Sequence, residues 1–341
     1  MRGESLSSNS LQLKNIRLLT LGLLMLVAGV FLNSGCDQSF DPQGPLDKRM
    51  VVFSVLSTDH KNQYVLVQQS YSVPDYNPLS HTADNSLDDV RVALNASNGS
   101  YFFVDTLLPR QDTSRYNFPI RSFVLRDFTP IGEATYEMVI QSRRYGLASA
   151  SVTVPGSSQI SRSQGVEQAL NAPRDYPNDF QLSFIVALSP AAKGVLSRLL
   201  LYYDVQKGNQ WFSERVEVPL NSGDSTLYTL DHAVYPQLAA TPATSRIALN
   251  YKNGYYRAIV YSVNSKYPTN HVIFKWVTLV ILQGDKNLVQ YYTSVHPSFD
   301  PYSIRLDEPI ASPVNGSLGL IGGYNLDSLV QLLPANFWGN K

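Results

Sequence analysis

The chain has 341 residues and carries 27 basic and 27 acidic side chains, so its formal net charge is zero. Without an excess of positive charge it has no long-range field that would attract nucleic acid, and a nucleic-acid-binding class is disfavoured. The length is that of about two domains, and the elements predicted in chain order divide it accordingly.

The first 36 residues have the pattern of an export signal. An uncharged apolar run occupies residues 18–32, and basic side chains precede it. Small residues ending at Gly35 follow the run and lead to Cys36, the only cysteine of the chain. This order is typical of a lipoprotein signal peptide. We therefore predict that residues 1–35 are removed by cleavage between Gly35 and Cys36, and that Cys36 receives lipid.

Two other interpretations of this segment stay open. An uncleaved membrane anchor needs roughly 20 apolar residues, a length that residues 18–36 reach only with a tilted helix. An ordinary signal peptide would leave Cys36 unmodified. The lipoprotein pattern is also imperfect, because Leu32 lies one residue further from the cysteine than usual and Asn33 takes its place.

Cys36 would define where the mature chain is held. A single cysteine excludes an internal disulfide framework. Several acyl chains on its thiol would anchor the protein durably, since each buried CH₂ contributes about 0.8 kcal/mol. We predict an outer-membrane, lipid-anchored protein of the cell envelope, with the periplasmic and surface faces both open. Residues 36–48, rich in proline and aspartate, are predicted to be the lipidated tether.

In residues 49–155, segments with a strand pattern alternate with short turn segments. Short strands at this spacing, with no helical periodicity among them, predict an antiparallel β-sandwich of immunoglobulin-like type. Asn98 and Gly99 supply the turn of one hairpin, because both tolerate a positive φ. The predicted hairpins join residues 49–56 with 63–70, 89–95 with 100–107, and 134–141 with 147–154.

A polar, aperiodic stretch at residues 156–178 is predicted to be a linker. Residues 179–333 follow as a second β-rich sandwich domain with at most a short helix at 286–294, and residues 334–341 as a C-terminal tail. Residues 272–283 are nearly all apolar, which favours a central strand buried on both faces. Further strands are predicted at 180–188, 198–205, 211–218, 246–251 and 254–263. The fold class is therefore all-β.

The chain's ending, residues 307–324, has the sequence DEPIASPVNGSLGLIGGY. Together with the cysteine at position 36 and the stretches FDPQGPLDKRMVVFSVL and YEMVIQSRRYGLASASVTVP, it resembles a family of uncharacterised Bacteroidota envelope lipoproteins that carry a domain of unknown function. Glu308–Pro309 and the run from Asn315 to Gly323 fit the family's ending, with altered glycine spacing. The resemblance implies an immunoglobulin-like sandwich followed by a second β-rich part, and an accessory role beside TonB-dependent outer-membrane transporters. It carries no catalytic residue over.

The residues that could carry chemistry give weak patterns. The glycines between Gly316 and Gly323 lack the lysine of a phosphate-binding loop and the βαβ context of a dinucleotide site, which favours tight turns or close backbone packing. The five histidines have no metal-ligand spacing, and the acidic loop around His81 misses the EF-hand pattern. No GxSxG run occurs. We predict no cofactor, no metal and no catalytic residue.

Adjacent aromatic residues give the better lead to a binding site. In a strand, one member of such a pair faces the core and the other faces outward. Outward rings suit a sugar platform or a protein interface, although they are equally suited to pairing across a half-buried sheet. The candidate binding residues are Tyr202, Tyr255, Tyr291 and Trp211.

Together these observations predict a lipid-anchored envelope protein that acts by non-catalytic binding. The leading hypothesis is an accessory subunit of an outer-membrane transporter or another envelope complex. A surface lipoprotein that binds a glycan or small ligand is the alternative, and an envelope hydrolase is a third.

The anchor prediction is tested by Cys36→Ala. The variant should accumulate as an unlipidated precursor, because no other thiol is available for acylation, and mass spectrometry of the membrane fraction measures this. Ser39→Ala, three residues further on, should mature normally. Normal cleavage and membrane retention of Cys36→Ala would contradict the prediction.

Overall fold

The computed structural model describes residues 47–72, 81–222, 233–241, 245–295 and 312–341. Residues 48–341 form one compact unit, in which two hydrophobic cores are joined by a single sheet. The predicted signal peptide, Cys36 and most of the tether lie outside the described residues. Within the described ranges, no helix has the length and apolar character needed to cross a membrane.

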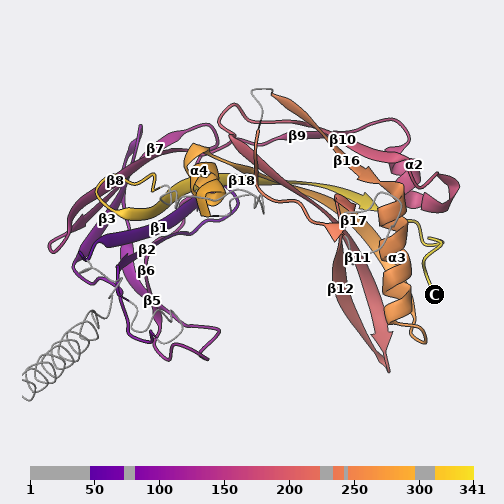
Figure 1. The fold of residues 1–341 in the computed structure, drawn as a ribbon, viewed down its shortest axis with the longest axis horizontal. Helices are drawn as coiled ribbons and strands as arrows, with labels where there is room; N and C mark the ends of the chain where they lie inside the picture. Colours follow the sequence, from indigo (N-terminus) through magenta and orange to yellow (C-terminus); the bar gives the residue numbers. More distant parts are fainter. Residues whose placement is uncertain (1–46, 73–80, 223–232, 242–244, 296–311) are drawn as a thin grey trace, which may run out of the picture. The chain divides into compact units, whose positions relative to one another are not determined.

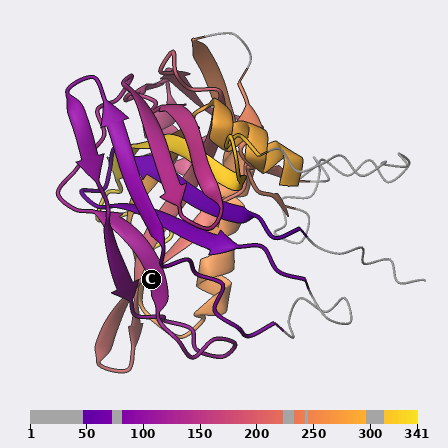
Figure 2. The same cartoon turned by 90° about the vertical axis from the view of Figure 1, so that its left-hand side faces the viewer.

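The first half is the predicted sandwich. The hairpin of β1 (Met50–Ser57) and β2 (Gln63–Gln69) is confirmed, as is that of β7 (Thr135–Ser142) and β8 (Gly146–Thr153). One layer contains β1, β2, β6 (Ile120–Leu125) and β5 (Val104–Leu108), and the other has the order β4-β3-β7-β8. Inward residues of both layers share one core. Figure 2 looks onto this half, whose indigo to magenta strands lie nearest the viewer.

One predicted hairpin differs from the structure in two respects. β3 (Val90–Ala96) pairs with β4 (Gly99–Phe102), and because Ala96 faces Gly99, the turn residues are Ser97 and Asn98 instead of the predicted Asn98 and Gly99. The returning strand also ends early. After the buried Phe103 the chain passes to the other layer as β5, so residues 100–107 belong to two sheets.

The second half has two β layers, with two helices packed on the core between them. β9 (Gln159–Arg162), β10 (Gln181–Ala187) and β16 (Arg246–Lys252) form a three-stranded sheet. It packs with α3 (Asn253–Lys266) and α2 (Val166–Asn171) against β11 (Gly194–Lys207), β12 (Gln210–Val218) and β17 (Val272–Gly284). The remaining elements are η3 (Pro173–Asp175), β13 (Asn221–Ser222), β14 (Ala233–Val234), β15 (Ala239–Ala240) and α4 (Lys286–Val295).

Two predictions for this half are wrong, and two are confirmed. Residues 254–263 lie in helix α3, because their buried side chains recur at helical spacing and suit one face of a helix better than a strand. The predicted linker 156–178 contains β9 and α2, whose Val166 and Leu170 are fully buried in the core. The helix near 286–294 is confirmed as α4, and the predicted central strand is confirmed as β17. Only one of its faces is fully buried, however, because its outward side chains, such as Val280 and Leu282, are half-buried.

The C-terminal strand β18 (Leu318–Leu332) joins the two halves (Figure 1). It pairs in parallel with β1 and in antiparallel with β17, so the main sheet runs β12-β11-β17-β18-β1-β2-β6-β5. The predicted boundary therefore separates the two cores but does not separate the sheet. The chain end also returns to the second core, where Phe337 is buried and Lys341 pairs with Val272.

The glycines of the predicted tight-packing run allow this pairing. Gly319 has φ +114°, and a Cβ there would overlap the carbonyl oxygen of Val52 in β1. A Cβ on Gly323 would lie 3.0 Å from Val152 Cγ1 on the opposite layer. The close-packing interpretation of this run is thus confirmed.

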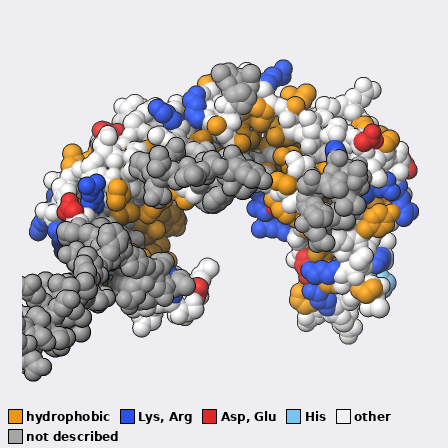
Figure 3. All heavy atoms as spheres, viewed as in Figure 1, with side chains coloured by type: hydrophobic (Ala, Val, Ile, Leu, Met, Phe, Trp, Pro, Cys, Tyr) orange, Lys and Arg blue, Asp and Glu red, His pale blue; other side chains and the backbone are white. Residues whose placement is uncertain are grey.

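In the first half, hydrophobic side chains also lie on the solvent-facing side of β1 and β2. Val51, Phe53 and Val55 of β1 point away from the core and are only half-buried, and Tyr64 of β2 is 45% exposed. Figure 3 shows hydrophobic side chains gathered over this part of β1 and β2. The main sheet therefore has apolar residues on both faces.

Substitution of Gly319 should test the role of β18. Gly319→Ala is expected to lower the free energy of unfolding by about 3 kcal/mol, because it adds a steric overlap to the strain of a positive φ. Chemical denaturation measures the loss. Gly208→Ala is the matched control, since Gly208 also has a positive φ of +62° but no atom lies within 4 Å of its added Cβ. Gly208→Ala should lower the free energy of unfolding by only about 1 kcal/mol. Equal losses in the two variants would show that the β1–β18 contact is not tight.

Candidate functional site

The candidate site lies on the face of β12, β11, β17 and β18 that points away from the second core, which we call the outward face. Inward residues such as Leu201, Tyr203 and Phe274 fill the core. The alternation of strand side chains then turns their neighbours outward. Strand pairing places four of them in one row across the sheet: Arg215, Tyr202, Trp276 and Leu332.

The two rings of this row are in contact. Tyr202 and Trp276 stack with their centroids 5.1 Å apart and an angle of 22° between the ring planes. A β-bulge accounts for the arrangement, because the register shifts between Tyr202 and Tyr203 and leaves Lys275 as an extra residue opposite β11. Bulges of this kind re-aim side chains next to functional sites. Here the bulge lets Lys275 and Trp276 both contribute to the outward face.

Charged side chains surround the rings. Arg198 binds Glu217 at 2.6 Å, and this bond raises the pKa of the Arg198 guanidinium. Lys275 lies 3.4 Å from Asp204, whose carboxylate also accepts a hydrogen bond of 2.7 Å from Ser213. Arg215 lies between the two ion pairs, and among the described residues no carboxylate pairs with it. Glu214 and Asp327 also line the hollows of this face, but their carboxylates are turned to the opposite face, where they bind Lys207 and Ser158. On the outward face itself, the site therefore has one cation more than it has anions.

Two hollows meet at Tyr202 and Arg215. The smaller, about 350 Å³, is lined by polar and charged side chains around the stacked rings. The larger, about 790 Å³, has an aliphatic floor and a charged rim at Arg198, Arg215 and Glu217. Its floor is made by Leu196, Leu200, Val280, Leu282 and Leu326. Volumes of this size and mostly apolar walls with few polar groups are usual for small-molecule sites.

Exposed aliphatic side chains extend the face along β18. Leu326, Val330 and Leu332 point outward with 41%, 51% and 70% of their surface exposed, and the exposed Ser328 lies between Leu326 and Val330. Contiguous exposed apolar residues rimmed by charge mark interaction sites more often than ordinary surface. The outward face thus combines a hollowed part and an open apolar part.

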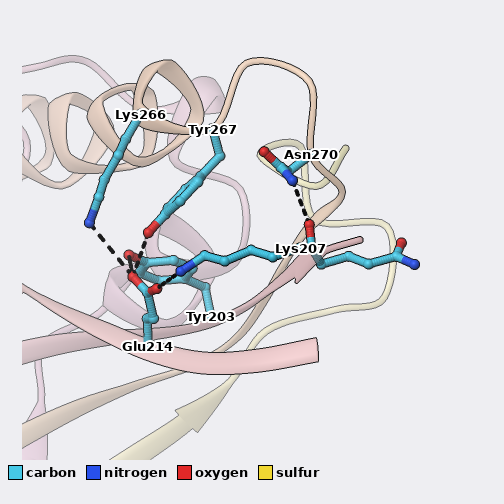
Figure 4. A network of polar contacts seen from close by, with 7 residues as sticks. Tyr203, Lys207, Glu214, Lys266, Tyr267 and Asn270 are labelled. Carbon is cyan, nitrogen blue, oxygen red and sulfur yellow. Dashed lines mark hydrogen bonds and ion pairs between the residues drawn. The ribbon is translucent and has the colours of Figure 1, made fainter. Parts of the chain in front are cut away.

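The opposite face of the same hairpin holds a polar network (Figure 4). The Glu214 carboxylate accepts hydrogen bonds from Lys207, Tyr267 and Tyr203 at 2.7, 2.7 and 3.0 Å. The Lys207 and Tyr267 bonds hold the pKa of Glu214 at about 2, and burial raises the pKa of Tyr203. This network ties the end of α3 to the hairpin, because Tyr267 follows the helix directly. We assign it a structural role, since all its groups bind one another.

The predicted binding residues do not form one site. Tyr202 lies in the outward face as predicted, with Tyr203 turned into the core. Tyr255 is buried within α3, so its predicted outward position is wrong. Tyr291 lies on α4 beside Phe53, and Trp211 is exposed near the end of the β11–β12 hairpin.

Sequence reasoning missed Trp276 and Arg215, the residues on either side of Tyr202. The sequence held a signal for Arg215 but not for Trp276. Residues 198–205 and 211–218 were predicted as neighbouring strands, and their alternation brings Arg215 to the face of Tyr202. Trp276 could not be placed on that face by alternation alone, because the bulge interrupts it.

Among the described residues, no group of three His, Cys, Asp or Glu side chains is arranged to hold a metal ion. In the acidic loop, Asp84 and Asp89 instead accept hydrogen bonds from the backbone amides of Ser86 and Arg144.

No family model and no curated protein matches the sequence. Among solved structures, the fold is similar to the C-terminal globular domain of an oligosaccharyltransferase from Pyrococcus abyssi, with 8% sequence identity and a TM-score of 0.22. The alignment covers 84% of this chain and 49% of that chain, so this protein spans about half its length. A likeness of this degree carries no argument about function.

The Glu214 network predicts a pH dependence of stability. The pKa of Glu214 is lower in the folded than in the unfolded chain, so its contribution is complete above about pH 4.5 and disappears as the pH falls towards 2. Glu214→Gln should therefore lower the free energy of unfolding by about 1 kcal/mol at pH 7. Urea denaturation should show the difference from the unmodified protein narrowing below pH 4.5. A difference that is constant down to pH 2 would exclude this role. Glu137→Gln, a change at an exposed position of β7, is the control.

Proposed function

We propose that the protein is a lipid-anchored, non-catalytic binding protein of the bacterial cell envelope, and that it docks on a membrane transporter or another envelope protein through its outward face. The single observation that supports docking is the open apolar row of Leu326, Val330 and Leu332 on β18. The signal pattern ending at Cys36 and the resemblance to envelope lipoproteins support the location.

The shape of the face also fits this role. It belongs to a sheet whose other side is packed on a core, so the backbone that presents the apolar row is rigid. Rigid presentation reduces the entropy lost on association. The rim of Arg198–Glu217 and Lys275–Asp204 adds paired charges beside the apolar part, as in the polar rim of many interfaces.

A second candidate function is the binding of a small ligand on the same face. The stacked rings of Tyr202 and Trp276 between two hollows favour it. Both functions are binding functions, and they use neighbouring parts of the face.

Docking is tested by co-purification from detergent-solubilised membranes of the natural host. Val330→Asp and Leu332→Asp should each reduce the amount of the co-purified envelope protein by roughly tenfold or more, because each buries a charge in an apolar contact. Quantitative mass spectrometry of the purified material measures the ratio.

The control for this experiment is Leu147→Asp. Leu147 is a leucine with 61% exposure, between the values of Val330 and Leu332, but it lies on β8, outside the main sheet. It should leave the ratio unchanged. If the unmodified protein purifies alone, or if all three variants retain the partner equally, the docking proposal fails.

A further inference from the structure

The hollowed part of the outward face has a chemical gradient. At one end of the row stands Arg215, which carries a positive charge that no described carboxylate neutralises. The stacked rings of Tyr202 and Trp276 follow, and the aliphatic floor of the larger hollow lies beside them. Polarity thus falls from a cation, through aromatic surface, to mainly aliphatic surface.

From this gradient we infer that the site binds an amphipathic monocarboxylate, an organic acid with an aromatic or aliphatic body. Its carboxylate pairs with Arg215, which presents a planar fork suited to two parallel hydrogen bonds. Its body lies against Tyr202 and Trp276 and extends over Leu200, Val280 and Leu282. The inference rests on the proposed ligand-binding role of this face and names the ligand class.

The charges around the site favour a ligand that carries a single negative charge. Arg198 and Lys275 are already neutralised by Glu217 and Asp204, so neither attracts a second anion strongly. These two carboxylates would repel a ligand with several negative charges. A single carboxylate at Arg215 leaves every charge of the site paired.

The sizes of the hollows agree with this class. Neighbouring strands lie about 4.8 Å apart, so Arg215 on β12, Tyr202 on β11 and Trp276 on β17 span roughly 10 Å before the aliphatic floor is reached. That length suits an acid with a chain of several carbons and a ring. The larger hollow also contains Thr278, Ser328 and Tyr235, but most of its surface is apolar, which favours an apolar body over a sugar with a hydroxyl on every carbon.

The test uses 6-phenylhexanoate and the matched alcohol 6-phenylhexanol with the purified protein, by calorimetry and by tryptophan fluorescence. The acid should bind at least roughly tenfold more tightly than the alcohol. Arg215→Gln should remove that preference by weakening the acid roughly tenfold or more while leaving the alcohol unchanged. Trp276→Leu should weaken both compounds alike, because both share the ring contact.

Arg91→Gln is the matched control, an exposed arginine on strand β3 of the other layer. It should change neither affinity. Equal binding of acid and alcohol, or an acid preference that survives Arg215→Gln, would overturn the inference while leaving ligand binding itself in place. No binding of either compound would overturn it as well, and the docking role would still be measured independently by the Val330 and Leu332 variants. Binding of glucuronate but not of 6-phenylhexanoate would replace it with an acidic-sugar site.

Discussion

The backbone pairing of β18 with β1 and β17 is the interaction on which the rest of the structure depends. Two cores that would otherwise be separate domains share one sheet because the last strand of the chain lies between the first strand and β17. This contact joins residues far apart in sequence and brings β1 close enough to require Gly319. It also supplies the fourth strand of the outward face. The candidate site is therefore complete only when β18, near the C-terminus, has paired with β17.

Buried polar groups stabilise the crossing point between the two cores. Gln283 of β17 accepts a hydrogen bond from the amide of Ser189 and donates one to the carbonyl of Gly156, so the segment that leaves the first core is bound to the sheet of the second. Asp327 of β18 accepts two hydrogen bonds from Ser158. Gln283 is fully buried, so loss of one of its partners would leave a group unsatisfied at a cost of about 1–3 kcal/mol, whereas Asp327 and Ser158 are partly buried. The connection between the two cores is thus fixed by specific hydrogen bonds as well as by close packing.

Much of the fold was predictable from alternation, because most strands bury one face. The helical segment α3 was missed although its pattern was present: Tyr255, Ile259 and Val263 recur every four residues, but aromatic and β-branched residues favoured a strand. The pairing of β18 was not predictable, since a run such as GLIGGY specifies close packing without naming the partner strand. The site was predicted only at Tyr202, because Arg215 and Trp276 join it through sheet pairing and a bulge.

The bulge at Lys275 explains why the stacked rings and the unpaired arginine lie next to each other on the sheet. With unbroken alternation, Phe274 and Val277 could not both face the core, and either Lys275 or Trp276 would be turned into it. The extra residue lets both side chains point outward, so that Lys275 reaches Asp204 and Trp276 reaches Tyr202. Asp204 is thereby occupied, so it does not neutralise Arg215 on the neighbouring strand. One irregularity in pairing thus gives both the stacked rings and the uncompensated cation, and a ligand that uses one of them lies within reach of the other.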